Sequence, residues 1–165
     1  MKQIIRWVLA VLICLFVFGL WYDWNYSMGI ADSYEINDKK STYSLLITTQ
    51  KSDYKDKVTQ KITDGLRGKD IYVKVIDQTK LFNILPEEYD AFIFLHTWEM
   101  WKAPHNISEL IHQADMKDKT FVVSTSGGGE LYHDGINGIS SASIILDAEA
   151  DAAKVHDWIE NLLTI

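Results

Sequence analysis

Apolar runs of strand length alternate with amphipathic helical patterns through most of this chain, and this alternation restricts the possible folds most strongly. Residues 43–49 (YSLLITT), 91–95 (AFIFL) and 120–124 (TFVVS) are largely apolar, as strands covered on both faces are. Residues 71–77 (IYVKVID) alternate as a strand does. Strands that alternate with helices predict an α/β domain, with a parallel sheet covered by helices on both faces.

Helical spacing marks three of the intervening segments. Residues 54–66 carry an apolar side chain at every fourth position and are followed by Gly68, which predicts an amphipathic helix with a defined end. An Asn-x-x-Glu pattern at residues 106–109 resembles a capping box and predicts a second helix from about Ile107. Residues 152–163 have one apolar face and predict the last helix.

The region between Ser124 and Ser143 is too short for a full crossover helix followed by a strand. We therefore expect the fourth helix of the domain to be missing or reduced to one turn. Residues 143–146 are expected to form a short fifth strand. The glycine-rich stretch after Ser124 then becomes the longest loop, and long loops in compact domains are often functional.

A charge-free apolar run, residues 7–22 (WVLAVLICLFVFGLWY), precedes the domain. With Ile4 and Ile5 added, and with the Arg6 side chain reaching back to the headgroups, it approaches the roughly 17 to 25 residues that span a bilayer. Trp7 and the aromatic residues between positions 21 and 26 are typical of membrane interfaces. We expect a transmembrane anchor at residues 1–22. A cleaved signal peptide is the alternative, because the basic start and the apolar length fit it too.

The charges around this run predict its orientation. Lys2 and Arg6 precede it, and Asp23 follows it directly. The excess of basic residues on the cytoplasmic side of membrane proteins therefore predicts a single-pass protein of the cell membrane. Its N-terminus is expected in the cytoplasm and its domain outside.

The rest of the chain is acidic. Residues 23–42 show no sustained period and are expected to be a tether, and residues 43–165 form the domain. Beyond residue 22 there are 14 basic and 23 acidic residues, a net charge of −9 that disfavours nucleic acid as a partner. The one cysteine, Cys14, lies in the apolar run, which excludes a disulfide framework, a cysteine zinc site and a cysteine nucleophile in the domain.

Two stretches resemble the flavodoxin-like family. Residues 88–95 (EYDAFIFL), followed by Thr97-Trp98 and the Trp-Lys-Ala-Pro of residues 101–104, are similar to the third strand and aromatic loop of that family. Residues 122–128 (VVSTSGG) resemble its fourth strand and Thr-Ser-Gly-Gly loop. The resemblance covers nearly all of residues 43–163. It implies a doubly wound sheet in the order 2-1-3-4-5, and flavin mononucleotide (FMN) held by three loops for electron transfer or a reductase reaction.

The first of these loops departs from the family. The family's hydroxyl- and glycine-rich phosphate loop corresponds here to residues 48–53 (TTQKSD), which contain no glycine. Thr48, Thr49 and Ser52 are the candidate phosphate ligands. Asp53 places a carboxylate at the same position, or it caps the following helix, for which aspartate is a preferred residue.

The other two loops supply the candidate ring site. Thr97, Trp98 and Trp101 come from the second loop, where the indoles can stack on a flat conjugated ring. Alternatively, one tryptophan packs onto the sheet and only the other is exposed. The candidates in the third loop, where glycine allows a close approach of the backbone or simply forms a turn, are Thr125, Ser126, Gly127 and Gly128.

Other chemistry finds less support. His96, His105 and His133 can meet at the carboxyl edge of the sheet beside Asp134 or Glu130, but their spacing matches no metal motif, and no metal is expected. No residue is assigned a catalytic role. The sequence therefore predicts a membrane-tethered, FMN-binding, flavodoxin-like protein with a redox partner. The alternative is a cofactor-free scaffold that acts as a binding or accessory module at the membrane.

Overall fold

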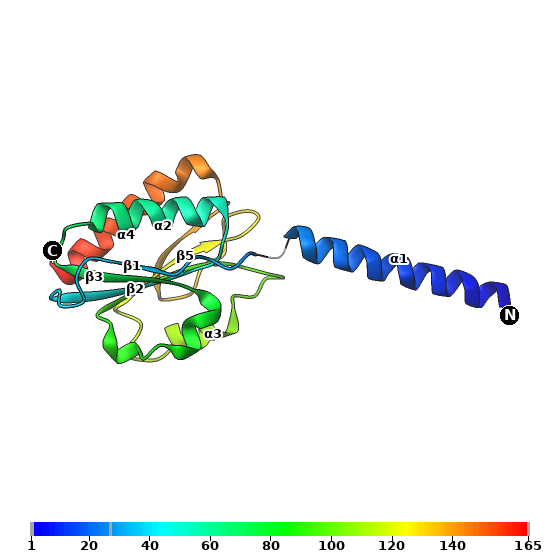
Figure 1. Cartoon of the computed structure of the whole chain (residues 1–165), viewed down its shortest axis with the longest axis horizontal. Helices are drawn as coiled ribbons and strands as arrows, with labels where there is room; N and C mark the ends of the chain where they lie inside the picture. The colour runs from blue at the N-terminus through cyan, green and yellow to red at the C-terminus, as the bar shows by residue number, and fades with distance from the viewer. Residues whose placement is uncertain (1, 27, 165) are drawn as a thin grey trace.

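Six strands form one mixed sheet in the computed structural model, which describes residues 2–26 and 28–164 (Figure 1). The side chains of Asp23, Asn25 and Tyr26 lie outside the described part, and so does the predicted interfacial position of Tyr26. The strands are β1 Tyr34–Ile36, β2 Tyr43–Thr49, β3 Ile71–Asp77, β4 Ala91–Thr97, β5 Thr120–Thr125 and β6 Asn137–Ser141. The helices are α1 Lys2–Tyr26, α2 Asp53–Leu66, α3 His105–Ile111 and α4 Ala148–Leu163, with 3-10 turns at Gln78–Asn83, Pro86–Glu88 and Ile145–Asp147.

The strand order is β1-β3-β2-β4-β5-β6. It differs from the expected five-stranded order because β1 adds a sixth, antiparallel strand at the edge beside β3, with Tyr34 opposite Val75 and Ile36 opposite Val73. Strands β2 to β6 are mutually parallel. The result is an α/β domain with a mostly parallel sheet, which is compatible with a flavodoxin-like fold.

Strand β1 lies within the stretch expected as a tether, and Asn37 fixes it in place. Its Nδ2 donates to the carbonyls of Leu66 and Ile71, both at 2.8 Å, and its Oδ1 accepts from the Gly68 amide at 3.0 Å. The φ of Asn37 is 63°, a left-handed conformation that asparagine tolerates better than most residues. Part of the segment between the apolar helix and β2 is therefore built into the domain.

Two apolar layers hold the helices against the sheet. Successive residues of a strand point to opposite faces, so Leu45 lies under α2 and α4, whereas Leu46 faces α3. Ile62 of α2 and Ile159 of α4 belong to the first layer, and Ile107 of α3 belongs to the second. Figure 1 shows α2 and α4 on one face of the sheet and α3 on the other.

The last strand is not where the sequence placed it. It comprises Asn137–Ser141, whereas Ser143 adopts a left-handed φ of 61° and Ile145–Asp147 form a 3-10 turn. Strand β6 has one apolar residue and is defined by its pairing with β5 rather than by its own pattern. Between β5 and β6 the chain forms a loop without a helix.

The second helix begins at His105, two residues before the expected start. The predicted capping box does not form, because the Asn106 side chain donates to the Gln78 carbonyl at 3.0 Å. Pro104 precedes the helix without any side-chain cap.

Helix α1 projects away from the domain and is exposed along its described length (Figure 1). Residues Lys2–Tyr22 of this helix are long enough and apolar enough to cross a membrane. The chain then joins the domain at the carboxyl edge of the sheet. There Gly29 pairs with Lys51, and the Ala31 amide donates to Asp77 Oδ2 at 2.7 Å.

Candidate functional site

Three loops meet at the carboxyl edge of the sheet, since β2, β4 and β5 are neighbours. They follow Thr49, Thr97 and Thr125, the last residues of these strands. In parallel sheets this edge is where ligands bind. All ten predicted site residues lie in or beside these loops.

The candidate phosphate ligands of the first loop have other roles. Ser52, rather than Asp53, is the N-cap of α2, and its hydroxyl accepts from the Lys55 amide at 3.3 Å. The Thr49 hydroxyl donates to the Gln50 carbonyl at 3.3 Å. The Thr48 hydroxyl is buried and has no hydrogen-bond partner. Asp53 is the first residue of the helix, where its carboxylate interacts favourably with the helix dipole.

The chain that arrives from α1 also covers this loop. The Lys51 amide donates to the Gly29 carbonyl at 3.1 Å, and the Lys51 ammonium pairs with Asp32 at 3.3 Å. Asp53 and Asp56 add two carboxylates in the first turn of α2. The Lys51 ammonium is thus paired, and the Lys51 amide is bonded within the protein's own chain, so neither is free to receive a phosphate.

Lys55 is a buried cation that sequence reasoning missed. Only 1% of its surface is exposed, and its Nζ donates to Thr97 Oγ1 at 2.6 Å. Burial lowers the pKa of the Lys55 ammonium to about 8, against the attraction of the Glu99 and Asp56 carboxylates. The spacing of Lys55, Thr59 and Thr63, four residues apart, could have indicated this burial, because it places the three side chains on one face of α2, and all three are buried.

The buried lysine belongs to a polar network that joins α2 to strands β4 and β5 and to the loop after β2. Thr97 Oγ1, which accepts from Lys55, lies 2.9 Å from Thr125 Oγ1 on the neighbouring strand. The Thr97 amide donates to Gln50 Oε1 at 2.8 Å. Two predicted cofactor ligands, Thr97 and Thr125, therefore use their hydroxyls within the protein.

The two tryptophans of the second loop differ in burial. Trp98 is half-buried and packs on His133, with ring centroids 4.9 Å apart. Trp101 is 84% exposed and lies at the tip of a hairpin in which Glu99 and Lys102 form the base. The structure thus agrees with the alternative in which one indole packs down and the other is free of the sheet.

The third loop borders a cavity of about 440 Å³. Its walls are the tryptophan loop on one side and the glycine loop on the other, formed by Trp98, Met100, Trp101, Ser126, Gly127, Gly128, Glu130 and Leu131. The Ser126 hydroxyl accepts from the Gly129 amide at 3.0 Å, which shapes the glycine loop as a tight turn. The cavity is large enough for a flat ring system and is lined by both apolar and polar groups.

A histidine pair packs against Trp98. The Nε2 atoms of His96 and His133 are 2.8 Å apart, and the Nδ1 atom of His96 is buried without a partner. Burial, followed by the neighbouring His133, lowers the pKa of His96 to about 3, and burial lowers the pKa of His133. His105 is exposed. Among the described residues, no group of three or more side chains is arranged to hold a metal ion.

The site therefore fits one part of FMN and not the other. The cavity beside Trp98 offers an aromatic wall and glycine amides to a flat ring. The first loop offers a phosphate no free hydroxyl cluster, and it presents Asp53 and Asp56 to an anion. Comparison of the chain with models of known protein families and with curated proteins finds no match.

Proposed function

We propose that this protein is a flavodoxin-like domain, anchored in the cell membrane by α1, that acts as a binding or accessory module without FMN. Its interaction surface comprises the tryptophan loop, residues 98–104, and the glycine loop, residues 126–131. The observation that carries the proposal is the first loop, where Gly29 pairs with Lys51 and Ser52 caps α2. An FMN phosphate needs that position open.

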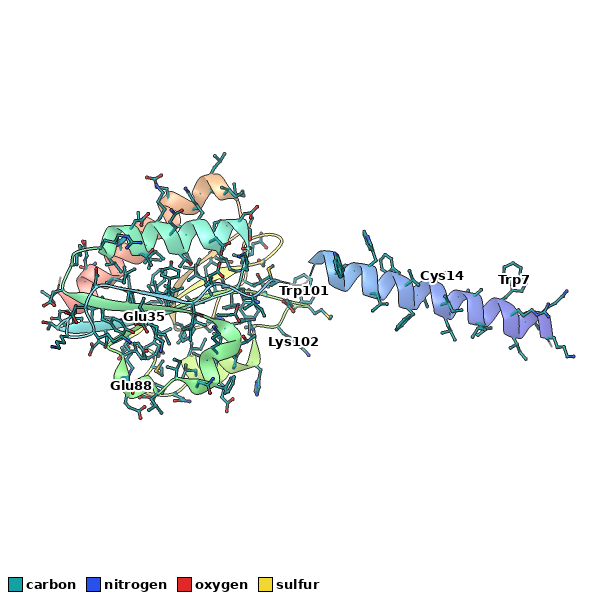
Figure 2. All side chains as sticks on the ribbon, viewed as in Figure 1. Trp7, Cys14, Glu35, Glu88, Trp101 and Lys102 are labelled. Carbon is teal, nitrogen blue, oxygen red and sulfur yellow. The ribbon has the colours of Figure 1, made fainter. Side chains whose placement is uncertain are left out.

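Site-specific photo-crosslinking in host membranes tests the binding role. A photoreactive amino acid at position 127 is suitable, because no atom lies within 4 Å of a Cβ placed on Gly127 and its φ is not positive. The same probe at the exposed Glu88, at the far end of the domain in Figure 2, is the matched control. We expect a discrete adduct from position 127 and none from position 88. Equal labelling from both positions, or none from 127, contradicts the proposal.

A second candidate function is FMN binding for electron transfer with a redox partner, and the cavity beside Trp98 favours it. Titrating the full-length protein in detergent with FMN and with riboflavin separates the two functions. A binding module without flavin leaves the fluorescence of both unchanged. A flavin protein that recognises the phosphate quenches FMN more strongly than riboflavin, and equal quenching indicates a site for the ring alone.

The anchor and its orientation have their own test. Basic residues Lys2 and Arg6 precede the apolar helix, so we propose a cytoplasmic N-terminus and an external domain. A reporter enzyme that is active only outside the cytoplasm, fused after Thr164, is expected to be active and membrane-bound. Activity recovered in the soluble fraction would instead indicate a cleaved signal peptide.

A further inference from the structure

The hairpin at the tip of the tryptophan loop combines strain with exposure. Glu99 and Lys102 exchange two backbone hydrogen bonds of 2.9 Å, which leaves Met100 and Trp101 as a two-residue turn. Both turn residues have positive φ, 47° for Met100 and 65° for Trp101. Such turns favour asparagine and glycine, and a bulky residue in this conformation is strained.

Neither side chain recovers that cost by packing within the domain. Met100 is 90% exposed and Trp101 is 84% exposed. Two large apolar side chains, held outward by a strained turn with a fixed base, are suited to a partner outside the chain.

The position of the hairpin indicates the partner. Figure 2 shows Trp101 and Lys102 at the end of the domain that faces α1, whereas Glu35 and Glu88 lie at the other end. The chain leaves α1 at Tyr26 and is already paired with the domain at Gly29, so the carboxyl edge of the sheet stays close to the end of the apolar helix. Any membrane that α1 crosses therefore lies directly beside the hairpin.

We propose that the Met100–Trp101 hairpin inserts into the headgroup region of the bilayer that α1 spans, as a second membrane contact. This inference rests on the proposed membrane anchoring. Tryptophan prefers the boundary between headgroups and acyl chains, and Lys102 can extend its ammonium to lipid phosphates. The carboxyl edge of the domain then faces the lipid surface, and the cavity of about 440 Å³ opens at that surface.

The surrounding charges restrict how deep the hairpin enters. Glu99 and Glu130 are exposed close to the tip, and the chain beyond residue 22 has a net charge of −9. Carboxylates avoid hydrocarbon, and an acidic surface is repelled by anionic lipids. The hairpin is therefore expected to remain in the interface, and to enter zwitterionic bilayers more readily than anionic ones.

Fluorescence of an environment-sensitive label tests the inference on the full chain. Cys14→Ala removes the only native cysteine, and Met100→Cys then carries an NBD label in phosphatidylcholine vesicles, with Trp101 retained. Glu88→Cys in the same background is the control. We expect a nitroxide attached at the lipid headgroup to quench position 100 at least twofold more than position 88, and aqueous iodide to show the reverse preference. Adding Trp101→Ser is expected to abolish the difference.

Vesicle flotation separates this inference from the anchor. If the protein floats with the vesicles but iodide quenches both positions equally, the anchor stands and the hairpin inference is overturned. If the protein does not float, the anchor itself fails and the inference fails with it. A matched Phe82→Ser variant, which changes an equally exposed aromatic residue outside the hairpin, is expected to leave the label at position 100 unaffected.

Discussion

Lys55 shows how one buried charge can define a site. Lysine is almost never fully buried without a partner of opposite charge. Here its ammonium contacts a threonine hydroxyl, Thr97 Oγ1, at 2.6 Å. The sequence analysis did not single out Lys55, and the nearby Lys51 and Lys57 are exposed. Thr97 reaches the ammonium because β4 lies beside β2 in the sheet. A local sequence pattern does not predict which strands are neighbours.

The buried ammonium makes stability depend on alkaline pH. The pKa of Lys55 is about 8 in the folded protein and about 10.5 in an unfolded chain, so between these values the unfolded state holds a proton that the folded state has lost. The free energy of unfolding therefore rises with pH above 8, by at most about 1.4 kcal/mol per pH unit for this group. Urea denaturation between pH 7 and 9.5 measures the slope. Lys55→Met is expected to remove it, and Lys57→Met, which changes an exposed lysine, is expected to keep it.

The histidine pair makes stability depend on acid. Burial and His133 lower the pKa of His96 to about 3. Below pH 6.5 the His96 imidazole is therefore protonated in the unfolded chain but stays neutral in the folded protein. The free energy of unfolding is expected to fall from pH 6.5 to 4.5 by about 1 kcal/mol per pH unit. His96→Gln is expected to flatten this dependence, whereas His105→Gln at an exposed position leaves it unchanged. An unchanged slope in His96→Gln would contradict the assignment.

At the scale of elements, predictability follows burial. Strands β2 and β3 could be predicted with their observed bounds because their apolar patterns are dictated by contact with helices. Strand β1 has one buried residue, Ile36, and β6 is composed mostly of small polar residues. Their existence depends on neighbouring strands, so neither could be found from its own residues. The sequence also left open which of the two loop tryptophans packs onto the sheet, because this depends on the contact of Trp98 with His133, a residue distant in the sequence.

Asn37 ties β1 to the turn between α2 and β3, and its loss tests whether this segment belongs to the domain. Asn37→Ala removes three hydrogen bonds and places alanine at a φ of 63°. We expect the free energy of unfolding to fall by about 2 to 3 kcal/mol. Asn161→Ala, which removes one exposed hydrogen bond in α4, is expected to change it by less than about 0.5 kcal/mol. Equal effects of the two variants would mean that β1 is only loosely attached.

The strain in the hairpin predicts that a substitution at Trp101 can raise the stability of the domain while it weakens membrane contact. Trp101→Gly relieves a left-handed φ of 65°, so in detergent the thermal midpoint is expected to rise, corresponding to about 1 kcal/mol. Phe82→Gly, at an equally exposed position whose φ is not positive, is expected to lower it because glycine adds entropy to the unfolded chain. If Trp101→Gly destabilises as much as Phe82→Gly, the turn is not strained.

At the scale of the whole molecule, the attachment of the apolar helix explains the form of the site. The segment after α1 enters at the carboxyl edge, where Gly29 pairs with Lys51 of the first loop. Figure 2 shows Trp101 and Lys102 at the same end of the domain, from which α1 projects. The apolar helix and the loop that would hold a phosphate are thus linked through the pairing of Gly29 with Lys51.

The flavin content of the protein purified from its own host membranes tests this account most directly. After acid release, flavin absorbance is measured per mole of the full-length chain. The pairing of Lys51 with Gly29 and the hydrogen bonds of the Ser52 and Thr97 hydroxyls predict a colourless protein, with less than about one tenth of an equivalent of flavin. About one equivalent of FMN, by the same order-of-magnitude measure, would contradict the account and favour an electron-transfer protein.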